Sequence, residues 1–167
     1  MKELSEVMAS RTARETGPVA NVHYMAGLGL MNCNKFREAI PELEASMEKA
    51  YDDTLAPSVP DIRTWKPKHL LANCHASVGN ELEAIMLWDE VIADCHDSVD
   101  PFHDYARFLS TLNRNKGALE ILLKGLKVAG DTQKIWELGC GIVNKDPELA
   151  EMSLEWTEEA VKHHPES

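Results

Sequence analysis

The stretch Asn21–Tyr51, NVHYMAGLGLMNCNKFREAIPELEASMEKAY, decides the fold of this chain of 167 residues. Apolar residues recur three and four positions apart on both sides of a break at residues 33–35, a spacing that predicts two short amphipathic helices. We expect the first helix over about residues 19–33 and the second over about residues 36–51. The rest of the chain repeats this helical pair with changes.

Helical periodicity and turn residues predict the other elements. A helix at residues 2–15 ends at Gly17-Pro18, and the prolines within residues 52–62 predict a loop. Gly79-Asn80 predicts a left-handed cap between the helices of the second pair. The remaining helices are expected at about residues 66–78, 81–95, 101–112, 116–129, 132–143 and 147–163. Every periodic segment has the helical period, so the predicted fold class is all-α.

An internal repeat becomes visible when the alanine early in each second helix is aligned. Ala39, Ala84 and Ala118 lie 45 and 34 residues apart, and the excess in the first interval falls on the loop with the prolines. Small residues stay small and large residues stay large in the aligned columns. These columns are Gly27/Ala72/Ala106, Cys33/Val78/Leu112, Ile40/Ile85/Leu119, Leu43/Trp88/Leu122 and Met47/Ile92/Leu126.

The 34-residue spacing and the alanine followed four positions later by a large residue resemble the tetratricopeptide repeat (TPR). The closing proline of that repeat is absent, and Tyr51, His96 and Gly130 stand in its place. Trp136-Glu137-Leu138-Gly139 resembles the opening of a fourth unit. The resemblance implies a short right-handed superhelix of antiparallel helix pairs. We expect one domain over residues 1–167, with an N-terminal helix at 1–16, repeats at 19–51, 65–97 and 99–130, and an atypical helix pair at 131–164.

A narrower resemblance rests on the long first linker and on Thr64-Trp65-Lys66-Pro67-Lys68-His69-Leu70-Leu71. These residues are similar to the TPR tail of bacterial family 2 glycosyltransferases, in which the repeats follow a catalytic domain. No strand-rich nucleotide-sugar domain is predicted in this chain. The resemblance therefore implies an accessory module that positions the acceptor or mediates oligomerisation, as an alternative function.

Charge and composition exclude several classes of partner. The net charge is -11, with 28 acidic and 17 basic residues, whereas nucleic-acid binding needs clustered Lys and Arg. No apolar run approaches the roughly 20 residues of a membrane span, and residues 1–14 lack the apolar core of a signal peptide. Four well-separated cysteines in a chain of this size predict reduced thiols and a cytoplasmic protein.

Metal binding and catalysis find little support in the sequence. Cys74-His75 and Cys95-His96 could suggest zinc, but adjacent helical residues point about 100° apart and do not offer both side chains to one ion. A pair of Cys140 and His103 has no glycine-rich oxyanion turn nearby. We therefore predict no metal, no cofactor and no enzyme activity.

The predicted function is a protein-binding or peptide-binding scaffold. In TPR arrays the first helix of each pair lines the concave face, and the residues outside the packing columns are expected to be exposed there. Two other interpretations stay open, a solvated face and a face filled by the N-terminal helix, and homodimer formation is open as well. The predicted partner-binding residues are Tyr24, Leu28, Met31, His69, Asn73, His103, Arg107 and Trp136.

Overall fold

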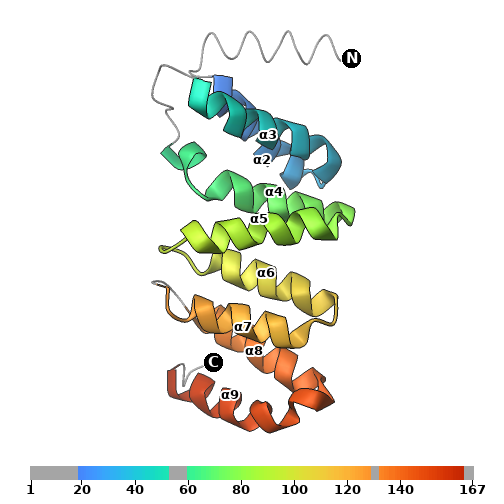
Figure 1. Ribbon diagram of the computed structural model, residues 1–167, viewed down its shortest axis with the longest axis vertical. Coiled ribbons are helices and arrows are strands. Elements are labelled where there is room, and N and C mark those ends of the chain that lie inside the picture. Colours follow the sequence, from blue (N-terminus) through green and yellow to red (C-terminus); the bar gives the residue numbers. More distant parts are fainter. Residues whose placement is uncertain (1–18, 53–59, 129–131, 164–167) are drawn as a thin grey trace. The chain divides into compact units, whose positions relative to one another are not determined.

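The computed structural model describes residues 19–52, 60–128 and 132–163, and every regular element in these ranges is a helix (Figure 1). The helix predicted at residues 2–15 lies outside the described residues. The chain divides into two compact units, residues 1–91 and 92–167. A single domain stays a prediction.

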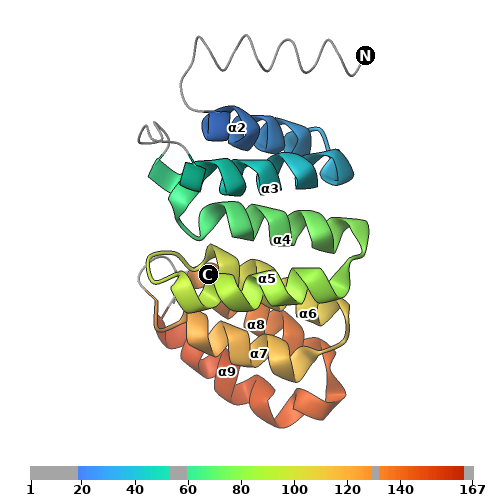
Figure 2. The same ribbon diagram turned by 45° about the horizontal axis from the view of Figure 1, so that its top comes forward.

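The first unit contains α2 (Val19–Asn32), α3 (Phe36–Asp52), the 3-10 helix η1 (Pro60–Arg63), α4 (Lys66–Val78) and most of α5 (Glu81–Asp94). α2 packs against α3, and α4 packs against α3 and α2 (Figure 2). Their shared core is apolar and includes Ala20, Tyr24, Leu43, Leu71 and Cys74. The predicted helix at residues 66–78 is confirmed in its bounds.

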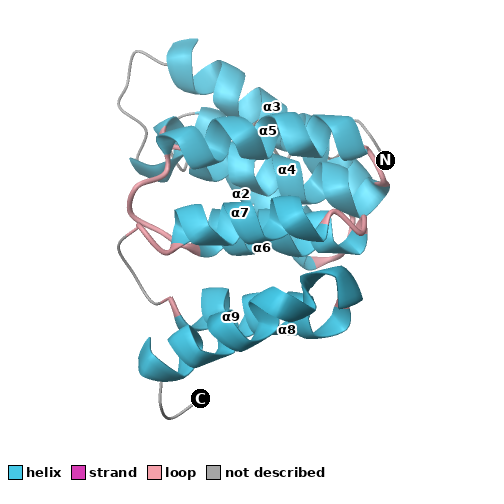
Figure 3. Cartoon of the chain, turned by 60° about the horizontal axis from the view of Figure 1, so that its bottom comes forward, coloured by secondary structure: helices cyan, strands magenta, loops and turns pink. Residues whose placement is uncertain are grey.

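The second unit contains α6 (Asp100–Thr111), α7 (Asn115–Gly125), α8 (Gln133–Lys145), the 3-10 helix η2 (Pro147–Leu149) and α9 (Ala150–His163). α6 packs against α7, and α8 packs against α9 (Figure 3). α8 also contacts both α6 and α7. α7 ends at Gly125, earlier than the predicted 129, because glycine is a weak helix former and a turn follows it. The last helix, predicted to start at Pro147, begins there only as the 3-10 helix η2, and α9 itself starts at Ala150. Asp146 Oδ1 accepts the Glu148 N–H at 3.0 Å.

The same tight turn joins the two helices of each repeat. Its central residue has a left-handed φ, 57° at Asn34, 87° at Gly79 and 57° at Asn113. Each lies five residues before the aligned alanine, and the next residue donates its N–H over 2.9 Å to a carbonyl five residues earlier. Asn and Gly tolerate this conformation best. The cap predicted at Gly79 is confirmed, and the two asparagines were not identified from the sequence.

Three of the aligned columns, those of Gly27, Ala39 and Leu43, are buried. Ala39, Ala84 and Ala118 have no exposed surface, and Leu43, Trp88 and Leu122 are at most 1% exposed. Ala72 and Ala106 are fully buried as well. The other columns are less buried. In the column of Ile40 only Leu119 is buried, and every member of the Met47 column is half-buried. The column of Cys33 is wrong in part: Cys33 is exposed, because it lies at the end of α2 in the turn, and the other two members are half-buried.

The α8–α9 pair repeats the packing of the earlier pairs with one extra residue. Gly27 and Leu43 are 16 positions apart, and a Cβ on Gly27 would meet the Leu43 side chain. Gly139 and Trp156 are 17 positions apart, and a Cβ on Gly139 would overlap the Trp156 indole. The η2 turn between α8 and α9 accommodates the extra residue. Trp156 therefore takes the place that Leu43 and Leu122 hold in the other pairs.

Candidate partner-binding site

The predicted binding residues occupy repeated positions on the first helix of each pair. Within each helix, one position lies three residues before the small packing residue and another lies one residue after it. Positions four apart share a helix face. The pairs are Tyr24/Leu28 on α2, His69/Asn73 on α4, His103/Arg107 on α6 and Trp136/Cys140 on α8. Cys140 was missed by the sequence prediction, although the column that contains the other residues points to it.

The α2 residues belong largely to the core of the first unit. Tyr24 is only 7% exposed and lies in the same apolar cluster as Leu43. Leu28 and Met31 are partly buried and pack against that cluster. The prediction that Tyr24 is exposed is therefore wrong, because its ring fills space between the helices of the first unit.

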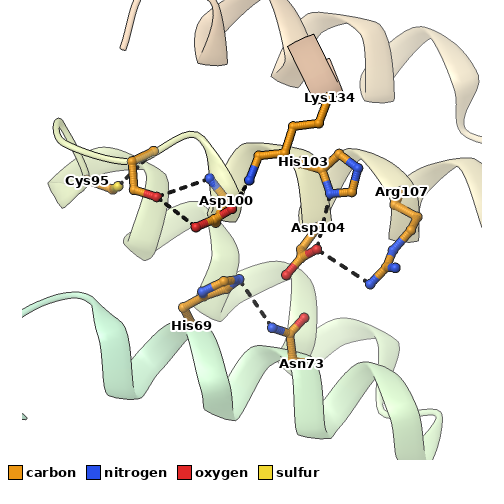
Figure 4. A network of polar contacts seen from close by, with 9 residues as sticks. His69, Asn73, Cys95, Asp100, His103, Asp104, Arg107 and Lys134 are labelled. Carbon is orange, nitrogen blue, oxygen red and sulfur yellow. Dashed lines mark hydrogen bonds and ion pairs between the residues drawn. The ribbon is translucent and has the colours of Figure 1, made fainter. Parts of the chain in front are cut away.

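On α4, His69 and Asn73 form a polar pair within the first unit. The Asn73 amide nitrogen lies 3.2 Å from His69 Nε2 (Figure 4). His69 is buried, and its ring centroid lies 5.9 Å from that of Trp65. The prediction that His69 is exposed is therefore wrong, because its ring is held on two sides, and the half-buried Asn73 is the more accessible member of the pair.

On α6, a carboxylate lies between the two predicted residues. Asp104 Oδ1 is 3.3 Å from His103 Nδ1 and 3.5 Å from Arg107 Nη2 (Figure 4). The Arg107 side chain is 63% exposed, so its guanidinium is only loosely held by this contact. One turn earlier, Asp100 forms an ion pair with Lys134 of α8. The Arg107 guanidinium is therefore an accessible hydrogen-bond donor on α6, the helix that also carries the carboxylates of Asp100 and Asp104.

On α8, Trp136 is a core residue rather than a surface residue. It is 9% exposed, and its ring centroid lies 5.2 Å from that of Trp156. Trp156 Nε1 donates to the backbone oxygen of Trp136 at 3.2 Å. His163 stacks on Trp136 with 5.3 Å between the ring centroids. The prediction that Trp136 is exposed is wrong, since the two indoles and His163 pack together where α8 meets α9.

The cysteines are free thiols with different surroundings. Burial raises the pKa of Cys74 to about 11. Burial also raises the pKa of Cys95, against the lowering effect of hydrogen bonds with the backbone of Ser98 and Asp97. Within the described ranges, no three His, Cys, Asp or Glu side chains are grouped so that they could hold a metal ion.

Solved structures share this arrangement of helices. MamA aligns with a TM-score of 0.69 and 12% identity over 92% of this chain and 83% of its own. Pseudomonas aeruginosa PilF aligns with a TM-score of 0.63 and 15% identity over 89% of this chain and 62% of its own. A Podosopora anserina protein described as a kinesin light chain with nearly identical TPR-like repeats aligns with a TM-score of 0.64 and 15% identity, covering 88% and 75%. The chain has a TPR-type fold.

Identities this low show a shared fold and nothing finer. No protein-family model matches the chain, and no curated protein matches it in sequence. The narrower resemblance to a glycosyltransferase tail has no support among the TPR structures named above. In the part of the chain that the structure describes, no helix combines the length and the apolar character needed to cross a bilayer.

Proposed function

We propose that the chain is a non-catalytic scaffold that binds protein or peptide partners through the exposed faces of the first helices of its pairs. The residues proposed to contribute are those predicted from the sequence, with the buried Tyr24, His69 and Trp136 acting as core supports rather than as exposed contacts. Cysteines in the free form support a reducing compartment, which we propose is the cytoplasm. The charge of -11 argues against nucleic acid as the partner.

One observation carries this proposal. In α2, α4, α6 and α8 the packing residue stays small, as Gly27, Ala72, Ala106 and Gly139, while the residue that follows it changes completely. That residue is Leu28, Asn73, Arg107 or Cys140, and each is half-buried or exposed. The small residues hold the helices in contact, and the residue after each of them can vary and present an apolar, amide, guanidinium or thiol group to a partner. Such mixed surfaces suit peptide recognition.

The alternative function, an accessory tail of a glycosyltransferase, has no structural observation in its favour and is not proposed. Homodimer formation likewise has no observation that favours it over a heterologous partner. The proposal therefore concerns a binding partner that is a different protein or peptide.

A random peptide library displayed on phage, selected against the immobilised chain, tests the proposal. Selected peptides should bind the parent chain and lose about 2 kcal/mol, roughly a 30-fold weakening, with Arg107→Ala, because arginine is a frequent interface hot spot. Isothermal titration calorimetry with each synthetic peptide measures the change.

Arg114→Ala is the matched control, since it removes another exposed arginine of the same unit, located in the α6–α7 turn. Asn73→Ala tests α4 in the first unit with its own selected peptides. Peptides that bind the parent, Arg107→Ala and Asn73→Ala with equal affinity would contradict the proposed faces.

A further inference from the structure

Within each unit, the helix that follows a pair packs against both members of that pair. α4 contacts α2 and α3, and α8 contacts α6 and α7. In the second unit, Lys134 at the start of α8 forms an ion pair with Asp100 of α6. A Cβ on Gly125 of α7 would come within 3.3 Å of Ile135 of α8. The surface between two paired helices is therefore a groove that receives a third helix.

The α8–α9 pair has a cleft in the corresponding position. The alignment of Gly139 with Ala106 also aligns Gln133, which lines the cleft, with Asp100, which contacts the third helix in the earlier pair. The cleft has a volume of about 310 Å³, at the lower end of the range of roughly 300–1,000 Å³ for ligand pockets. Among the described elements of this unit, α9 contacts only α8 and η2. The other residues that line the cleft are Trp136, Glu137 and Cys140 of α8 and Thr157, Ala160 and Val161 of α9.

The lining residues make an apolar floor with helical spacing. Positions 136, 137 and 140 lie on one face of α8, and positions 157, 160 and 161 lie on one face of α9. Val161 is 57% exposed, so an apolar side chain at the cleft stays in contact with water. Covering such a surface with the apolar stripe of an amphipathic helix is a common mode of peptide recognition.

The charges beside the cleft indicate which kind of partner helix would bind there. Glu137 lines the cleft on α8, and Glu158 lies on α9 three positions before Val161; both carboxylates are exposed. The basic residue next to Val161, Lys162, forms an ion pair with Glu159 at 2.6 Å. Opposite charges on a partner favour association and its rate, whereas like charges oppose it. A second copy of this chain, with its net charge of -11, is a poor occupant of an acidic groove. A helix with Lys or Arg on both sides of its apolar stripe is complementary.

We infer that the α8–α9 cleft binds one amphipathic helix of a basic partner protein. The apolar stripe of this helix covers Ala160 and Val161, and its Lys or Arg side chains face Glu137 and Glu158. This inference narrows the proposed function, on which it rests, from partners in general to one surface and one class of partner.

Two synthetic peptides of about 18 residues, five helical turns, serve as probes. Both carry leucine at positions i, i+3, i+4 and i+7, and the remaining positions are lysine in one peptide and glutamate in the other. The lysine peptide should bind at least about tenfold more tightly by calorimetry. Failure of the lysine peptide to bind, or equal binding of both peptides, would overturn the inference.

Val161→Glu separates docking in the cleft from general attraction between opposite charges. The new carboxylate blocks the apolar floor, so the lysine peptide should bind about tenfold more weakly. Met86→Glu is the matched control, because Met86 is 58% exposed and lies in the first unit; its effect should stay below about twofold. If the lysine peptide bound the Val161→Glu variant as tightly as the parent, or more tightly, its binding would reflect general attraction to acidic residues rather than docking in the cleft. Circular dichroism verifies that both variants remain helical.

Protection of thiols from alkylation locates the bound peptide in the unmodified chain. Cys140 lines the cleft, whereas Cys33 is exposed in the first unit. The lysine peptide should slow the alkylation of Cys140, measured by mass spectrometry, and leave the rate at Cys33 unchanged. If the peptide did not slow the alkylation of Cys140, the cleft would be excluded as the docking site. If Arg107→Ala or Asn73→Ala still weakened the binding of the library peptides, the proposed function would stand without the inference about the cleft.

Discussion

Helix pairs α2–α3 and α8–α9 both begin with a helix that carries two glycines separated by one residue. Gly27 and Gly139 lie at the helix contact, whereas a Cβ at Gly29 or Gly141 would meet no atom within 4 Å. At Gly27 the facing side chain is Leu43, and at Gly139 it is the Trp156 indole. The two pairs thus share a glycine at the helix contact and differ in the spacing by one residue and in the side chain that packs on the glycine.

The difference shows how the size and mobility of one facing side chain decide how strictly glycine is required. Leu43 has two rotatable side-chain bonds and can move its methyl groups by a small rotation. Trp156 is a rigid ring that is hydrogen-bonded to Trp136 and packed against its indole. We therefore expect the last pair to tolerate changes at its contact less well than the first pair.

The largest expected effect is the loss of an indole in the last pair. Trp136→Ala should lower the free energy of unfolding by about 3–5 kcal/mol, because it leaves a cavity beside Trp156. Urea unfolding of the intact chain measures the loss. Amide exchange locates it, since α8 and α9 should lose protection first. A loss below about 1 kcal/mol would mean that Trp136 acts as a surface residue.

The two contact glycines test the comparison directly. Gly139→Ala should cost about 3 kcal/mol or more, because the indole has little room to move, and Gly27→Ala about 1–3 kcal/mol. The measurement is again urea unfolding of each variant. Equal losses at the two positions would show that the mobility of Leu43 and the rigidity of Trp156 do not matter.

The alanine column offers a test of the shared register in the third pair. Ala118 is fully buried in α7, and Ala118→Leu should overpack its contacts and cost about 1–3 kcal/mol. Thermal unfolding followed by circular dichroism measures the change. Glu120→Leu, at an exposed position of the same helix, is the control and should change stability by less than about 0.5 kcal/mol.

The smallest expected effect has the opposite sign. Gly29→Ala and Gly141→Ala meet open space, and alanine is the better helix former by about 0.8–1.0 kcal/mol. Each variant should therefore be slightly more stable than the parent in urea. Destabilisation at either position would mean that its helix has a further neighbour on that side.

Much of the fold could be predicted because the residues that pack between helices recur with a regular spacing in the sequence. The columns of Ala39 and Leu43 follow from the alignment of the repeats, and the cap at Gly79 follows from turn chemistry. The burial of Tyr24 and Trp136 could not be predicted in the same way. An aromatic residue next to a packing column is compatible with either a surface or a core position, and only the neighbouring helices decide which one it occupies.

The two indoles of Trp136 and Trp156 also have an optical consequence. Their ring centroids are 5.2 Å apart and their planes are inclined by 57°, so their electronic transitions couple in a chiral arrangement. Such a pair produces an exciton couplet in the circular dichroism spectrum that is added to the helical signal. The couplet depends on contact between α8 and α9, and it therefore provides a spectroscopic signal of the integrity of the last helix pair in the otherwise unlabelled protein.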